Sequence, residues 1–115
     1  SIDKEILDFM EHNKDTLKIV IGPLVSVNII NKLKSQGYSL IINPENIFEL
    51  IKRSEKIYSK FGVSVFEIIA LKKKPIVFSR FNKKDKKIIM KLKNKNYINI
   101  YKKKLNFIIK KLEYL

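Results

Sequence analysis

The residues best suited to chemistry lie between positions 59 and 67, where a glycine and two polar side chains follow a β-rich run. Gly62 sits in the turn between a predicted strand and a predicted helix, and Ser64 opens that helix. Backbone N–H groups and the dipole at a helix N-terminus attract phosphate, and a glycine lets the backbone approach closely. Glu67 follows one helical turn later, where its carboxylate could accept hydrogen bonds from two ribose hydroxyls. The segment therefore predicts a site for a phosphorylated ligand.

The same spacing also has a purely structural interpretation. Ser64 and Glu67 fit the capping-box pattern, in which the two side chains only satisfy N–H groups at the start of a helix. Lys60, two residues before Gly62, either offers a cation to the phosphate or is simply solvated. Spacing alone favours the cap.

These residues must be positioned by an alternation of short β-rich runs and amphipathic helical stretches. Strands are predicted at residues 17–21, 39–42, 56–59, 75–79 and 97–101. Helices are predicted at residues 2–12, 25–36, 64–71, 83–95 and 105–115, and one more opens at Asn43-Pro44-Glu45. The alternation predicts an α/β fold, a three-layer domain whose mostly parallel sheet is covered on both faces. Ligands of such sheets bind beyond the carboxyl ends of the strands, here loops 22–26, 43–47, 59–65 and 79–83.

Length and composition narrow the class of protein. The 115 residues suit one domain, residues 1–115, and a hydrophobic fraction of 45% supports a real core. The chain has no cysteine, which excludes a thiolate metal site, and its single histidine, His12, cannot form a metal cluster alone. We expect no metal and no cofactor. No apolar run approaches the length of a transmembrane segment, and the lack of cysteine fits a cytoplasmic protein.

The net charge of +14 is confined to one part of the chain. Residues 1–70 are neutral, whereas residues 71–115 hold sixteen basic and two acidic residues. Only Arg53 and Arg80 are arginines, and the side chains that nucleic-acid readers favour are arginine forks and stacking aromatics. We therefore expect no specific nucleic-acid partner. The basic part is either a solvated lysine surface or a surface that faces phosphates, acidic glycans or an anionic membrane.

Three longer stretches carry a resemblance to a known family. They are residues 45–51, residues 54–67 with Ala70-Leu71, and the proline-led run Pro75-Ile76-Val77-Phe78; Ile19-Val20-Ile21-Gly22-Pro23 adds a preceding strand. Together they resemble the C-terminal, Rossmann-like half of B-type glycosyltransferases. The pattern is most similar to the UDP-sugar hydrolase of the pseudaminic-acid pathway and its relatives in spore-coat polysaccharide biosynthesis. The resemblance covers about residues 16–90.

The resemblance implies a role for each matching residue. The diphosphate would be surrounded by Gly62, Val63, Ser64 and Val65. Glu67 would bind the ribose hydroxyls, backbone groups of Asn46 and Ile47 would contact uracil, and Asn82 would lie near the sugar. The chain departs from the family at bulky Lys60 and Phe61, where small residues are usual, and at Lys83, where a glutamine is usual.

The resemblance also implies what surrounds this chain. It predicts that residue 1 follows the first strand of a truncated nucleotide-binding domain, and that a preceding domain of the same protein carries the catalytic groups. We therefore assign no catalytic residue and expect no turnover from this chain alone. The absent strand would lie between strands 17–21 and 56–59, so those two would pair directly, or a homodimer would fill the gap.

Three functions follow from the sequence. The first is binding of a UDP-sugar for hydrolysis or glycosyl transfer in surface-polysaccharide or nonulosonic-acid biosynthesis. The second is a basic module that binds nucleic acid or anionic glycan through residues 71–115. The third is a domain that kept the fold and lost the ligand.

Overall fold

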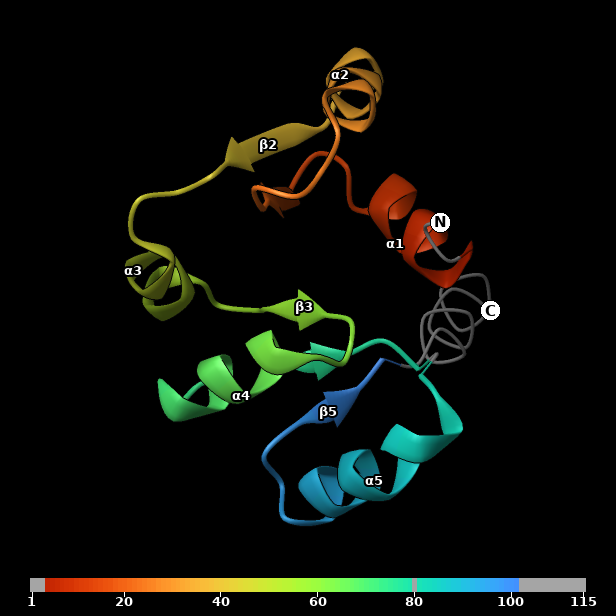
Figure 1. Ribbon diagram of the computed structural model, residues 1–115, viewed down its shortest axis with the longest axis vertical. Coiled ribbons are helices and arrows are strands. Elements are labelled where there is room, and N and C mark those ends of the chain that lie inside the picture. The colour runs from red at the N-terminus through yellow and green to blue at the C-terminus, as the bar shows by residue number, and fades with distance from the viewer. Residues whose placement is uncertain (1–3, 80, 102–115) are drawn as a thin grey trace, which may run out of the picture. The chain divides into compact units, whose positions relative to one another are not determined.

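The computed structural model describes residues 4–79 and 81–101, and the chain divides into two compact units (Figure 1). The first unit is Ser1–Ile47 and the second is Phe48–Leu115. Helices and parallel strands alternate along both, which confirms the α/β class expected from the sequence.

The first unit is a helix–strand–helix–strand arrangement. Its elements are α1 (Lys4–His12), β1 (Lys18–Ile21), α2 (Val27–Ser35) and β2 (Ser39–Ile42). The two strands pair in parallel, with Lys18 opposite Ser39 and Ile21 opposite Ile42. Helix α2 begins after Ser26, whose side chain accepts a hydrogen bond from the N–H of Ile29 (3.3 Å).

The core of the first unit is formed by all four elements and the turns that join them. Its buried residues are Met10, Ile21, Leu33 and Tyr38, and half-buried Ile6, Leu17, Ile19, Val25, Ile30 and Leu40 pack against them. The β-branched run at 17–21 predicts a buried strand, but in β1 Lys18 and Val20 are exposed and only Ile21 is buried. Burial in β1 alternates with the period of the strand.

The second unit contains a three-stranded parallel sheet. Its elements are α3 (Ile47–Arg53, which starts at the unit boundary), β3 (Tyr58–Ser59), α4 (Val63–Ala70), β4 (Ile76–Val77), the 3-10 helix η1 (Lys83–Asp85), α5 (Lys86–Asn94) and β5 (Asn99–Ile100). The strand order is β3-β4-β5, and both pairings are parallel. The carboxyl ends of the three strands therefore share one edge of this sheet.

The core of the second unit joins α4 and α5 to the sheet. Its fully buried side chains are Val65 from α4, Val77 from β4, Ile89 from α5, and Ile98. Phe61, Ile69, Phe81, Leu92 and Ile100 surround them. One core thus fixes the start of α4 and one face of α5 against the strands.

Three helices end in the same Schellman turn before a β-strand. At α2, the N–H groups of Gly37 and Tyr38 bond to the carbonyls of Lys34 (3.0 Å) and Leu33 (3.2 Å). The residue in the left-handed conformation is Gly37 after α2 (φ 87°), Lys72 after α4 (φ 62°) and Asn96 after α5 (φ 65°). The position of Gly37 directly after the predicted helix 25–36 indicates a glycine C-cap, which the structure confirms. A lysine and an asparagine take the same position after the other two helices.

The helix predicted to open at Asn43-Pro44-Glu45 begins later. Asn43 adopts a left-handed conformation (φ 46°), and its N–H bonds to the carbonyl of Ile21 at 2.9 Å. The residue therefore extends the parallel ladder instead of capping a helix, and α3 starts at Ile47. The helix predicted at 105–115 lies outside the described residues.

The described strands form two sheets and not one five-stranded sheet. Among these residues, β1 is hydrogen-bonded only to β2, and β3 only to β4. The direct pairing considered for the strands near 17–21 and 56–59 would join the two units, and it stays a prediction.

Candidate functional site

The best candidate site is the N-terminus of α4, directly after β3. Gly62 is the residue before the helix, and no side chain caps the first turn. Ser64 lies inside that turn, because α4 begins at Val63. The capping-box interpretation of Ser64 and Glu67 is therefore wrong: the position that a capping side chain would occupy belongs to a glycine.

The surroundings of Gly62 are open. Its backbone is extended (φ 177°), a conformation that any residue adopts, and a Cβ atom added there would meet no atom within 4 Å. Its carbonyl accepts a hydrogen bond from the N–H of Val65 at 3.1 Å, which closes the first turn of α4. Neither backbone strain nor crowding within the protein therefore explains a glycine at this position.

The polar residues of α4 lie on its solvent-accessible side. Ser64 and Glu67 are both exposed and three positions apart, a spacing that places side chains on the same helix face. Val65 points the other way and is fully buried in the core, so only its backbone could contact a ligand. The backbone of Val63 forms the first residue of the helix. The structure thus brings the four predicted diphosphate residues and Glu67 together on one helical start.

The loop after β4 lies at the same edge of the sheet. Since β3 and β4 are adjacent and parallel, the segments that follow them leave the sheet at the same end. Asn82 is exposed in the second of these segments, immediately before η1, and its side chain makes no cap hydrogen bond. Asn82 and the start of α4 therefore share the carboxyl edge of the second unit.

The two bulky residues of the turn behave differently. The Phe61 ring packs edge-on against Phe66, with 5.9 Å between ring centroids, and contributes to the core. Lys60 is exposed. Phe61 therefore anchors the turn to the fold, and the cation of Lys60 stays accessible beside Gly62.

The predicted uracil contacts belong to the first unit. Asn46 is exposed and directly precedes α3, and half-buried Ile47 is the first residue of that helix. The division of the chain falls just after Ile47, whereas the start of α4 and Asn82 lie in the second unit.

Sequence reasoning missed an aromatic cluster beside the candidate site. Tyr58, Phe78 and Tyr101 come from β3 and from the carboxyl ends of β4 and β5, and their ring centroids lie 5.5–6.4 Å apart. Phe78 is buried, and the two tyrosines are half-buried. One aromatic residue at or just after each of three predicted parallel strands was the signal that could have revealed it.

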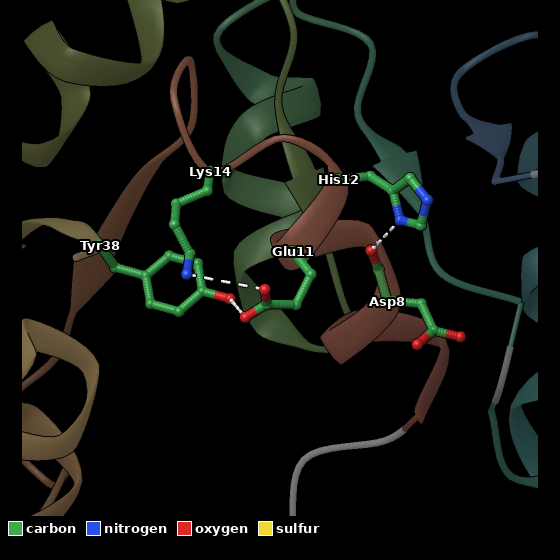
Figure 2. A network of polar contacts seen from close by, with 5 residues as sticks. All are labelled: Asp8, Glu11, His12, Lys14 and Tyr38. Carbon is green, nitrogen blue, oxygen red and sulfur yellow. Dashed lines mark hydrogen bonds and ion pairs between the residues drawn. The ribbon is translucent and has the colours of Figure 1, made fainter. Parts of the chain in front are cut away.

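The first unit contains a separate polar network around Tyr38 (Figure 2). The Tyr38 hydroxyl donates to Glu11 at 2.5 Å, and Lys14 Nζ lies 3.6 Å from the other Glu11 oxygen and 4.7 Å from the centre of the Tyr38 ring. Burial, followed by the bond to Glu11, raises the pKa of Tyr38 to about 12. The Tyr38 bond lowers the pKa of Glu11 below its usual value.

The His12 side chain lies at the end of α1 and contacts the backbone of its own helix. Its Nδ1 lies 2.8 Å from the carbonyl oxygen of Asp8, and the ring is exposed. Within the described ranges, no group of three or more histidine and carboxylate side chains is arranged to bind a metal.

Comparison with protein-family models, curated proteins and solved structures finds no match to this chain. Within residues 4–79 and 81–101, no helix has the length and apolar character needed to cross a bilayer.

Proposed function

We propose that the second unit binds the diphosphate of a UDP-sugar at the N-terminus of α4. One observation carries the proposal. The eight-residue helix α4 follows Gly62 and has no side-chain cap, with open space beside the glycine, at the carboxyl edge of a parallel sheet. Such a start presents backbone donors and a positive helix dipole to an anion. In open α/β sheets this edge is where ligands bind.

The remaining groups suit the rest of the ligand. Glu67 lies one turn along the exposed face of α4, within reach of ribose hydroxyls for a diphosphate at Gly62. Asn82, on the neighbouring loop of the same unit, would contact the sugar. Lys60 would add positive charge beside the diphosphate.

The proposal extends to the protein as a whole. The two units would belong to a three-layer, Rossmann-like half of a B-type glycosyltransferase fold, whose other domain supplies the catalytic groups. The activity would be UDP-sugar hydrolysis or glycosyl transfer in surface-polysaccharide or nonulosonic-acid biosynthesis.

Titration of the labelled protein with UDP, followed through backbone amide shifts, tests the site. We expect the amides of residues 62–67 to shift first, with Asn82 moving when a UDP-sugar replaces UDP. Uridine, which lacks the phosphates, is the matched control and should leave residues 62–65 nearly unchanged. Shifts confined to the lysine-rich residues after position 71 would contradict the assignment.

A further inference from the structure

A row of exposed lysines runs along η1 and α5. Four exposed lysines follow one another at spacings of three or four residues: Lys84, Lys87, Lys91 and Lys95. Together with exposed Ile88 they form the lysine face. The face spans about 16 Å at 1.5 Å per residue. It lies opposite Ile89, which is fully buried in the core of the second unit.

The lysine face lacks the acidic partners found on other helices of the chain. Residues 83–95 contain seven lysines and one acid, Asp85, a net charge of +6. In the described part of the chain, no ion pair joins any of these lysines to a carboxylate, whereas Lys14 pairs with Glu11 and Lys52 with Glu49. Like charges three or four residues apart destabilise a helix. An external polyanion would relieve that repulsion.

The apolar member of the face indicates which polyanion fits. Ile88 is 46% exposed and lies among Lys84, Lys87 and Lys91. Ile88 and Ile89 are neighbours in α5, but only Ile89 is buried. At a membrane interface an apolar side chain enters the boundary layer while lysine ammonium groups remain among the headgroups.

We propose that the lysine face binds a membrane surface rich in anionic lipid, with Ile88 inserted at the interface. Clusters of four to eight lysines on an amphipathic helix suit anionic headgroups, because attraction to them depends on charge density and not on directional hydrogen bonds. Readout of bases favours the planar fork of arginine and stacking aromatic rings. The lysine face contains neither, so a nucleic acid fits it less well than a lipid surface.

Sedimentation with vesicles of phosphatidylcholine containing about one-third phosphatidylserine tests the proposal. We expect the whole protein to bind these vesicles and not vesicles of pure phosphatidylcholine. The bound protein should dissociate as the salt concentration rises. Each lysine near an anionic surface contributes about fivefold to partitioning, so Lys87→Gln combined with Lys91→Gln should weaken binding about 25-fold. Ile88→Ser alone should also weaken vesicle binding, but the dependence of that binding on salt should stay the same.

The matched control is Lys32→Gln combined with Lys34→Gln. These exposed lysines lie on α2, in a run (Ile-Ile-x-Lys-Leu-Lys) that α5 repeats, and their loss changes the net charge equally. Equal vesicle binding by the two double variants would overturn the proposal. So would tight, salt-sensitive binding of a mixed-sequence single-stranded oligonucleotide that is lost in the Lys87/Lys91 variant while vesicle binding is unchanged.

Discussion

The hydroxyl of Tyr38 donates a 2.5 Å hydrogen bond to the carboxylate of Glu11, a residue 27 positions earlier in the chain. Tyr38 follows the turn after α2, and Glu11 lies in the last turn of α1. Tyr38 is buried, and Lys14 covers its ring while also pairing with Glu11. This bond therefore fixes the end of α1 to the start of β2 within the first unit.

The Tyr38–Glu11 bond predicts a loss of stability at alkaline pH. The pKa of Tyr38 rises from 10.0 to about 12, mainly because of burial and then because of the bond to Glu11. The folded protein thus keeps a proton that the unfolded chain releases, so the stabilisation is complete below pH 10.0 and disappears as pH rises toward about 12. Thermal unfolding of the natural protein and of Tyr38→Phe should show a difference that changes through this range. If the melting temperatures of the two proteins differ by the same amount at every pH, the ionisation of Tyr38 does not affect folding stability.

The same bond has an acid-side counterpart at Glu11. Its pKa lies below the ordinary value of 4.5, first because Tyr38 donates to the carboxylate and then because Lys14 is close. The contribution of Glu11 is therefore present above pH 4.5 and decreases as pH falls through the lowered value. Glu11→Gln should remove this acid dependence, whereas Asp15→Asn, at an exposed position in the turn after α1, serves as the control. Equal acid unfolding profiles for the two variants would count against the Glu11 contribution.

Gly62→Ala separates ligand binding from folding. A Cβ at this position meets nothing within 4 Å and the backbone is extended, so the stability loss should stay within about 1 kcal/mol, the cost of alanine at a helix N-cap. If the diphosphate approaches Gly62, the methyl group should displace it and cost about 1.5–3 kcal/mol of UDP binding, as for a lost charge-assisted hydrogen bond. Calorimetric titration gives the affinity and thermal unfolding the stability. Gly22→Ala is the matched control, because its added Cβ also meets open space, and unchanged UDP affinity in both variants would falsify the site.

Glu67→Gln tests the ribose contact. Glu67 is exposed and does not cap α4, so the substitution should leave the melting temperature nearly unchanged. Loss of a charged partner for the ribose hydroxyls should weaken UDP binding by about 1.5–3 kcal/mol. Glu55→Gln, an exposed acid in the loop before β3, is the control for net charge. A lowered melting temperature with unchanged affinity would assign Glu67 a structural role instead.

Two adjacent isoleucines of α5 should differ sharply in their contribution to stability. Ile89 is fully buried against Val65, Val77 and Ile98, so Ile89→Ala should cost about 2–5 kcal/mol. Ile88 is 46% exposed, and Ile88→Ala should cost less than about 0.5 kcal/mol. Urea unfolding of both variants measures the difference. Similar losses would mean that the orientation of α5 is other than described.

The sequence predicts the alternation of elements well because local signals determine it. Burial at 3.6-residue spacing places Phe9, Met10 and Leu33 on the inner faces of their helices, and Gly37 ends α2 where a left-handed residue is needed. The start of α3 could not be read in this way. Asn43 has the side chain of a helix cap, but its backbone N–H bonds to the carbonyl of Ile21, and that long-range contact overrides the local preference.

At the candidate site, too, tertiary contacts could not be predicted from the local sequence. From spacing, Ser64 and Glu67 fit a capping box, because the pattern does not reveal that the helix starts one residue before Ser64. The Tyr38–Glu11 bond and the aromatic cluster of Tyr58, Phe78 and Tyr101 depend on which strands and helices meet. Those encounters are tertiary, and no window of local sequence contains them.

The Schellman turns after α4 and α5 place non-glycine residues in the left-handed conformation, so a single substitution there could raise the stability of the fold. Lys72 and Asn96 hold the left-handed conformation that Gly37 adopts without steric conflict, and lysine tolerates it worse than asparagine. Lys72→Gly would remove a clash between Cβ and the backbone from the folded protein, while the greater freedom of glycine in the unfolded chain would offset part of the gain. Position 72 is therefore a place where one substitution is expected to raise the melting temperature.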